Sequence, residues 1–223
     1  MGILRIHLNK GEKITAESGA MVSIQGNIET ETRMREGGFL KNLKVSILGS
    51  ESFFVNDFIA HEDNSVIELT GAYLGDIEYI PISSDRGYIV QSSAYIASSS
   101  GITLDTKWQG FKKGIFGSNL FMLKANGQGD LFVNVYGAII SHDLKDGEKI
   151  IIDNYQLVAL TDGTKYDVKK HGGYKTAIFG GEALVIEITG PGKVYYQTKN
   201  FRDWIKLLQQ YLPTNQGGSG RHS

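Results

Sequence analysis

Apolar residues occur along this chain in short bursts rich in β-branched and aromatic side chains, and turn residues separate the bursts. Such bursts are typical of β-strands joined by tight turns like Asn126-Gly127 and Asp162-Gly163. Phe121–Leu123 and Leu184–Ile186 are continuously apolar, which indicates strands covered on both faces. The pattern predicts strands at Met21–Ile24, Ser52–Ala60, Val66–Thr70, Ile77–Ile82, Tyr88–Ser92, Ala94–Ala97, Leu120–Ala125, Leu131–Tyr136, Lys149–Ile152, Leu157–Leu160, Leu184–Ile188 and Val194–Gln197. We therefore expect an all-β fold.

One segment near the end of the chain has a different period. Its apolar residues recur at helical spacing: Phe201, Trp204, Ile205, Leu208, Tyr211 and Leu212. Asn200 is a favourable N-cap, and Pro213 would end the helix. The sequence predicts an amphipathic helix that packs on the chain's own sheets or docks on another molecule. Its possible contact residues are Phe201, Trp204 and Leu208.

Three eight-residue segments repeat one pattern. They are Leu43–Ser50 (LKVSILGS), Phe111–Ser118 (FKKGIFGS) and Tyr174–Gly181 (YKTAIFGG). The strands and turns after each segment align in the same order. Self-similarity at a spacing of this size indicates an internal duplication, which fixes architecture before any residue-level chemistry.

The duplication predicts three tandem β units, at residues 1–84, 85–145 and 146–200. The helix then occupies residues 201–213, and residues 214–223 form a Gly/Ser-rich tail expected to be disordered. Units of about 60 residues are more stable when packed together than alone. We expect one structural domain of three β-sandwich-like units around a pseudo-threefold axis, closed by the helix.

Charge and composition narrow the function classes. Formal net charge is −1, because 23 Lys and Arg nearly balance 24 Asp and Glu, and this disfavours nucleic-acid binding. The absence of cysteine excludes disulfides, thiolate metal sites and cysteine nucleophiles. Met1–Thr15 has the alternation of a strand and lacks the apolar core of a signal peptide. No run of residues is apolar enough to cross a bilayer. A cytoplasmic protein is the expectation.

Residues that could carry catalysis are dispersed. No histidine lies within five residues of another, so the spacing of a metal site is missing, although distant histidines could still meet in the fold. Carboxylate pairs such as Glu29/Glu31 fit a solvated strand face, and no nucleophile elbow surrounds the serines. We expect no enzyme activity, no metal and no cofactor, with a small-ligand enzyme as the least favoured class.

The repeated segments also carry a lysine. It precedes the glycine by five residues, the reverse of a phosphate-binding loop, so a nucleotide site is not expected. Two interpretations stay open. The segments are structural turns with solvated lysines, or they form a contact surface for a partner chain or an acidic membrane face. The residues of that possible surface are Lys44, Ile47, Lys112, Ile115, Lys175 and Ile178.

Longer stretches resemble a known family. They include GAMVSIQGNIETETR, LTGAYLGDIEYI, GFKKGIFGSNLFMLKANGQGDLFV and GGYKTAIFGGEALVIEITGPGKVYYQT. They are similar to the altered-inheritance-of-mitochondria family, formerly a family of unknown function and later tied to mitochondrial biogenesis. The resemblance covers about residues 10–200. It implies a fold related to the trp RNA-binding attenuation protein, a short double-stranded β-helix or β-sandwich, here in three copies. It supplies no catalytic residue.

These observations together favour a non-enzymatic scaffold or binding protein. We expect a homo-oligomer that acts through protein contacts, with an unidentified protein partner, or through peripheral contact with a membrane. The alternative is an RNA-binding module, which rests on analogy with the attenuation protein. Dispersed lysines and near-neutral charge weigh against RNA.

Overall fold

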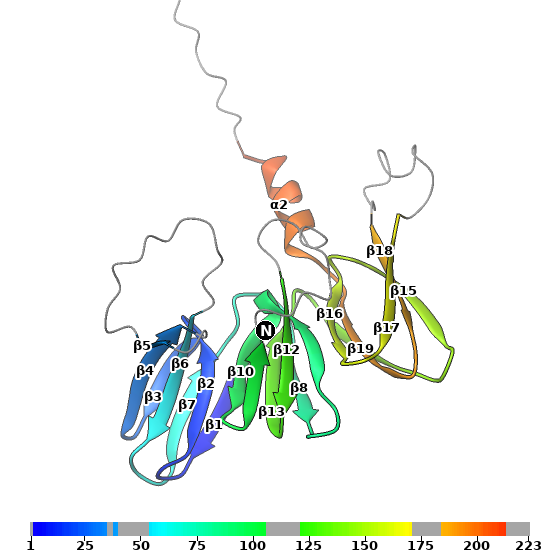
Figure 1. Ribbon diagram of the computed structural model, residues 1–223. Coiled ribbons are helices and arrows are strands. Elements are labelled where there is room, and N and C mark those ends of the chain that lie inside the picture. Colours follow the sequence, from blue (N-terminus) through cyan, green and yellow to red (C-terminus); the bar gives the residue numbers. More distant parts are fainter. Residues whose placement is uncertain (1, 35–37, 40–53, 106–120, 171–183, 213–223) are drawn as a thin grey trace, which may run out of the picture.

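The computed structural model describes residues 2–34, 38–39, 54–105, 121–170 and 184–212. In these residues the protein is mostly β, with a single α-helix at the C-terminal end (Figure 1). The first strands are β1 (Leu4–Leu8), β2 (Lys13–Glu17), β3 (Met21–Gln25), β4 (Ile28–Met34), β5 (Gly38–Phe39), β6 (Phe54–Ala60) and β7 (Ser65–Leu69). The all-β expectation is confirmed at this level.

The remaining elements continue the same style of short strands. The middle ones are β8 (Ile77–Ile82), β9 (Tyr88–Gln91), the 3-10 turn η2 (Ser92–Ala94), β10 (Tyr95–Ser99), β11 (Ile102–Asp105), β12 (Met122–Gly127) and β13 (Gly129–Asn134). The last are β14 (Ile139–Leu144), β15 (Lys149–Asp153), β16 (Leu157–Thr161), β17 (Lys165–Lys169), β18 (Val185–Thr189), β19 (Gly192–Gln197) and α2 (Phe201–Gln209).

One pattern of strand pairing occurs three times. We name the first unit β1–β7, the second β8–β13 and the third β14–β19. Leaving aside the two-residue β5, each unit has six strands. The sixth strand pairs antiparallel with the first and third, and the fifth pairs with the second and fourth. The breaks between units fall after β7 and β13, one strand earlier than the predicted boundaries at residues 84 and 145.

An irregularity recurs with the pairing. The third strand of each unit contains a register shift against the sixth strand, at Met21/Ser23 in β3, Tyr95/Ala97 in β10 and Leu157/Ala159 in β16. The residues at the shift are therefore equivalent: Val22, Ile96 and Val158. A bulge at one matching position in three units is a specific feature, because bulges re-aim the strand that carries them.

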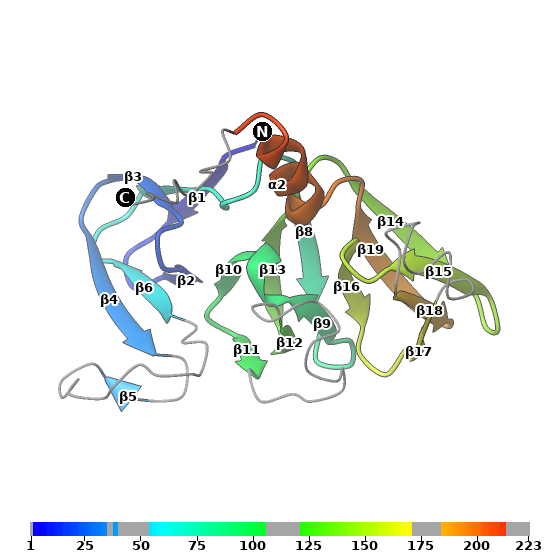
Figure 2. The same cartoon turned by 90° about the horizontal axis from the view of Figure 1, so that it is seen from above.

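The units join through their sheets. Strand β2 of the first unit pairs with β10 of the second, and β9 of the second pairs with β16 of the third. These pairings merge adjacent sheets into one seven-stranded and one six-stranded sheet, with a three-stranded sheet left at each end. Figure 2 shows the units following one another along an arc. A closed pseudo-threefold arrangement would also join the third unit to the first. The described strands contain no such pairing, so the row is open within the part of the chain that the structure describes.

Each unit has its own apolar core, and adjacent cores share side chains. Ile96 and Ala97 of the second unit belong to the core of the first unit. Val158 and Ala159 of the third unit belong in the same way to the core of the second. Packing also occurs in the other direction along the chain, since Ile89 and Met122 of the second unit belong to the core of the third. Burial of this kind makes each junction part of the folded core rather than a loose contact between units.

Candidate functional site

The six residues expected to form a contact surface belong to the repeated loop segments. Lys44, Ile47, Lys112, Ile115, Lys175 and Ile178 all lie outside the described residues. The contact surface that they were expected to form therefore stays a prediction. The described residues offer a second candidate surface, the helix α2 and the aromatic residues against which it packs.

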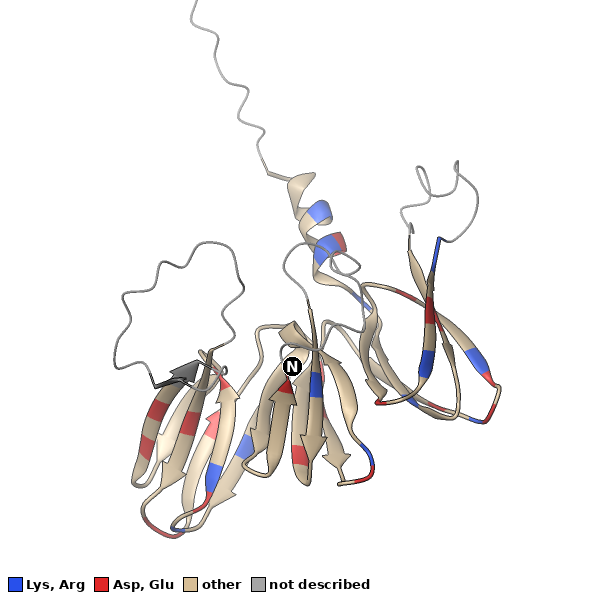
Figure 3. Cartoon of the chain, in the orientation of Figure 1, with Lys and Arg blue, Asp and Glu red and all other residues tan. Residues whose placement is uncertain are grey.

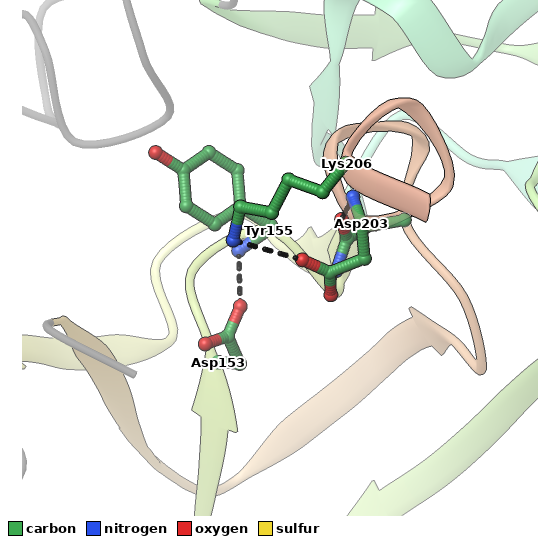
Figure 4. Close-up of polar contacts among 5 residues, drawn as sticks. Asp153, Tyr155, Asp203 and Lys206 are labelled. Atoms are coloured by element: carbon green, nitrogen blue, oxygen red, sulfur yellow. Dashed lines mark hydrogen bonds and ion pairs between the residues drawn. The ribbon is translucent and has the colours of Figure 1, made fainter. Parts of the chain in front are cut away.

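The start of α2 follows from its sequence. The Asn200 side chain accepts a hydrogen bond from the backbone N–H of Asp203 (2.9 Å), which satisfies one of the free donors of the first turn. Asp203 also forms an ion pair with Lys206 (3.3 Å), as Figure 4 shows. The acidic group thus lies in the first turn and the basic group in the last, the order that the helix dipole favours.

Aromatic side chains attach α2 to its own chain. Phe201 lies 6.2 Å from Tyr73 between ring centroids, and Trp204 lies 6.2 Å from Tyr136. Tyr73 precedes β8 and Tyr136 precedes β14, so both belong to linkers between units. The two tyrosines are themselves in contact at 6.4 Å. Of the predicted helix contacts, Phe201 and Trp204 therefore meet linkers of the same chain rather than a sheet face.

A cation–π contact adds a third attachment. The Arg202 guanidinium lies 4.9 Å from the centre of the Tyr155 ring, in the turn after β15. The backbone N–H of Tyr155 donates to Asp153 in that turn (2.8 Å; Figure 4). The helix consequently contacts both linkers and the third unit. Its position is set by residues far away in the sequence.

The C-terminal end of α2 and the residues just after it stay exposed despite these contacts. Leu207, Tyr211 and Leu212 are exposed, and Tyr211 retains 78% of its accessible surface. Leu208, the third predicted contact, is partly buried. No residue of the helix is fully buried. An apolar group of this kind at the end of a helix is a recognised mark of an interaction surface.

A polar position recurs where the second strand of each unit ends. The residues are Glu17, Gln91 and Asp153, which pair with Val55, Met122 and Val185 in the fifth strands. The following residues in each unit, Ser18, Ser92 and Asn154, donate equivalent backbone hydrogen bonds to Phe54, Phe121 and Leu184 (3.1, 2.8 and 3.3 Å). The sequence analysis did not find this position. Aligning the three second strands would have revealed an acid or amide followed by Ser or Asn.

The acid of the first unit has an unusual environment. Burial raises the pKa of Glu17 from 4.5 to about 7, because the charged carboxylate loses its hydration. Gln91 at the equivalent position is buried and neutral. A protonated Glu17 resembles that glutamine, so the site favours a neutral polar group.

The variant Glu17→Gln is expected to stabilise the protein at high pH. The carboxyl holds its proton more tightly in the folded than in the unfolded chain, so stability is lost as pH rises from about 4.5 to about 7. Glutamine removes this loss. We expect a gain on the order of 2 kcal/mol at pH 8, allowing for partial exposure, and none near pH 4.

Denaturant unfolding at the two pH values measures this difference. The reverse variant, Gln91→Glu, is the matched control and should destabilise the protein at pH 8 more than at pH 4. Equal effects of Glu17→Gln at both pH values would contradict the assignment.

The described histidines are accounted for by ion pairs or exposure. His61 pairs with Glu29 (2.7 Å) and His142 with Glu148 (3.0 Å), all four side chains being exposed, and His7 is exposed on β1. Across the described part of the chain, no three His, Asp or Glu side chains are grouped so that they could hold a metal ion. His171 and His222 fall outside that part.

A surface hollow of about 510 Å³ lies beside the N-terminal strand. Its lining is Gly2, Ile3, Leu4, Asp76, Ile77, Glu78, Tyr79, Phe132 and Ile139. Asp76 accepts the backbone N–H of Ile139 (3.2 Å), and the Tyr79 hydroxyl donates to Asp130 (2.9 Å). That hydrogen bond raises the pKa of Tyr79, which opposes use of the phenol as an acid. These polar groups serve the fold.

Charges of both signs are spread over all three units, as Figure 3 shows for the described residues. Among the described residues, no helix is long and apolar enough to cross a membrane.

A protein-family model described as mitochondrial biogenesis AIM24 matches residues 1–199. The chain belongs to this family. The resemblance noted in the sequence is thereby confirmed over nearly the whole folded part. An uncharacterised protein of Streptococcus pyogenes serotype M6 is 26% identical to this AIM24-family chain over 220 residues, which cover 96% of the chain and 88% of that protein.

A crystal structure is also similar to this AIM24-family chain. It is that of a Streptococcus pyogenes protein determined by a structural genomics consortium, with 24% identity, a TM-score of 0.74 and 94% of each chain covered. At this identity the likeness shows the fold. The names of both relatives state no substrate, ligand or partner.

Proposed function

We propose that this AIM24-family chain is a non-enzymatic scaffold that binds another protein through the exposed C-terminal end of α2 and the two apolar residues just beyond it. The observation that carries the proposal is the group of Leu207, Tyr211 and Leu212, which remain exposed at the C-terminal end of the helix although Phe201 and Trp204 near its start are attached to the chain. Removing such side chains from water stabilises a complex by roughly 1.5–3 kcal/mol each when burial is complete.

The balance of charge on the helix favours a protein partner over a lipid surface. Arg202 faces the Tyr155 ring and Lys206 is paired with Asp203, so both basic groups are already engaged within the chain. Attraction to an anionic membrane amounts to about 1 kcal/mol for each basic residue near the surface. Because Arg202 and Lys206 already interact within the chain and Asp203 is acidic, the helix gains little of this attraction to an anionic membrane. The exposed apolar group is also small for an interfacial helix.

We also propose that the fold is related to that of the trp RNA-binding attenuation protein and that the protein is cytoplasmic. The three copies of one six-stranded unit are the observation that supports the expected threefold repeat. RNA binding by that analogy is the alternative. The dispersed charges of Figure 3 weigh against it, because affinity for a phosphate backbone needs clustered cations.

The double variant Leu207→Glu/Leu212→Glu tests the proposal. We expect a cross-linked protein partner, identified from the native host by mass spectrometry, to bind the parent and to bind the variant at least tenfold more weakly. Ile140→Glu, at an exposed apolar position on β14, is the matched control and should leave binding unchanged.

Two further assays separate the alternatives. Flotation with phosphatidylcholine vesicles, with and without phosphatidylserine, should leave the parent unbound, as should filter binding to RNA at two salt concentrations. Flotation that the variant loses would assign the helix to membranes. Tight, salt-dependent RNA retention would overturn the scaffold. Equal partner capture by parent and variant would remove α2 from the proposal.

A further inference from the structure

The junction between units is used twice within the chain and left incomplete at both ends. In each junction the second strand of one unit pairs antiparallel with the third strand of the next, β2 with β10 and β9 with β16. The third unit has a second strand, β15, which pairs only with β18 among the described strands. The first unit has a third strand, β3, which pairs only with β7 among them. The two free edges are the two halves of one junction.

The geometry points to head-to-tail self-association, in which β15 of one copy pairs with β3 of the next copy. The register follows from the internal junctions. Val90 lies opposite Ala159 in one of them, and Ala16 lies opposite Ala97 in the other. By equivalence, Ile152 would lie opposite Ser23 of the neighbouring copy and Ile151 opposite Ile24. This inference goes beyond the proposed α2 contact and does not depend on it.

Exposure along β3 differs from its equivalents as the inference requires. Val22 retains 50% of its accessible surface, whereas Ile96 and Val158 at the same bulge position retain none. Met21 retains 47%, while Tyr95 and Leu157 retain 1% and 0%. Ile96 and Val158 are covered because they pack in the core of the preceding unit, whereas Tyr95 and Leu157 are buried in the cores of their own units. The first unit has no preceding unit within the chain, and its equivalent residues are apolar all the same.

The opposite edge shows the same difference. Ile151, on the outward face of β15, retains 55% of its surface. Its equivalents are Thr15 in β2 and Ile89 in β9, which retain 4% and 2% because the next unit covers them. Ile89 lies in the core of the third unit, on the far side of the junction. Ile151 would enter the core of a neighbouring copy's first unit in the same way.

The chemistry of β3 fits an edge that becomes paired. Its five residues, Met21–Gln25, include no charge and no proline. Natural edge strands that must stay unpaired are usually protected by lysine, proline or inward charges. On β15, Lys149 is paired with Glu187 (3.1 Å), the residue opposite Ile151 on β18, so the charge beside Ile151 is already balanced within the chain. Strand addition here would satisfy the free backbone groups of both edges and bury the exposed side chains of Val22 and Ile151.

The two edges differ, so the interface is heterologous and each copy keeps one free end after pairing. Such an interface builds rings when the rotation closes and filaments when it does not. The units of one chain curve in one direction in Figure 2, which favours a ring. The stoichiometry is given by the mass of the assembly.

The test uses two single variants of the full chain, Val22→Asp and Ile151→Asp, each of which places a charge at one half of the junction. We expect the parent to form multimers whose mass increases with protein concentration, measured by light scattering during size-exclusion chromatography. Each variant alone should be a monomer. Circular dichroism should show both folded, because both positions are half exposed in the single chain.

Mixing the two variants gives the decisive measurement. Val22→Asp retains a sound β15 edge and Ile151→Asp retains a sound β3 edge, so the mixture should form a one-to-one dimer and nothing larger. Ile140→Asp, on a different edge strand, should assemble like the parent. A parent that is monomeric at all concentrations, variants with the parent's mass, or a mixture that stays monomeric would each overturn the inference. Loss of α2 contacts by Leu207→Glu/Leu212→Glu should leave the assembly mass unchanged.

Discussion

Replacing Ile96 by aspartate is expected to lower the free energy of unfolding by more than about 4 kcal/mol. Ile96 is fully buried and packs in the core of the first unit although it belongs to the second. Loss of a large aliphatic side chain from a core costs about 2–5 kcal/mol, and an unpaired buried carboxylate costs several more. Because domains are stable by only about 5–15 kcal/mol, much of the protein should unfold. Denaturant unfolding followed by circular dichroism measures the loss.

Val22→Asp provides the matched control for this prediction. The same substitution is made at the equivalent bulge position of the first unit, where half the side chain is exposed. We expect a change within about 1 kcal/mol when unfolding is measured at a concentration where the chain is monomeric. Similar losses in the two variants would contradict the view that the junctions between units are essential parts of the core.

The strands at sheet centres could be predicted because they are apolar on both faces. Leu123 and Ile186 lie in continuously apolar bursts, and both are fully buried. The sequence analysis missed β4, β5, β11, β14 and β17, which lie at or next to sheet edges, and covered the central strand β2 only in part. The reason is physical: an edge strand pairs on one side and faces water with half its residues, so β11 alternates buried and exposed positions. Short alternating runs such as ITLD carry little apolar signal.

The duplication was visible in sequence, but the arrangement of the copies was not. Repeated segments such as Phe111–Ser118 establish that units recur. They do not establish which strands pair across a junction. That choice depends on pairings such as β2 with β10, whose residues are about 80 positions apart along the chain. An open arc and a closed threefold arrangement therefore share one local sequence pattern.

For the candidate site, too, the sequence predicted the local features but not the long-range contacts. Asn200 and the helical spacing predicted where α2 begins, since capping is a local interaction. Tyr73 and Tyr136 could not be predicted as its partners, because they occupy linkers far away in sequence and meet only when the units pack. The predicted end of the helix at Leu212 is three residues beyond Gln209. Residues that close a helix end depend on packing as much as on the following proline.

Replacing Gly75 by alanine is expected to destabilise the protein by about 3 kcal/mol. Gly75 forms a parallel bridge with Gly137, where the two linkers between units run side by side. A Cβ atom added at Gly75 would lie 2.2 Å from the carbonyl oxygen of Gly137 and 2.3 Å from that of Val135. Both neighbours are backbone atoms, so the clash cannot be relieved by a side-chain rotation. Overpacking of this kind costs about 1–3 kcal/mol, and here it must move the linker itself.

A second glycine variant separates this crowding from backbone strain. Gly163 has a φ of +83° in the turn before β17, and an added Cβ would meet nothing within 4 Å. Gly163→Ala should therefore lose only the roughly 1 kcal/mol that the left-handed conformation costs a residue with a side chain. The contact between the two linkers also places Tyr73 and Tyr136 beneath α2. Because the chain has two tryptophans, the test is made in a Trp108→Phe background, where Gly75→Ala should alter Trp204 fluorescence under native conditions and Gly163→Ala should not. Equal losses of stability and unchanged fluorescence in both variants would show that the contact between the two linkers does not position the helix.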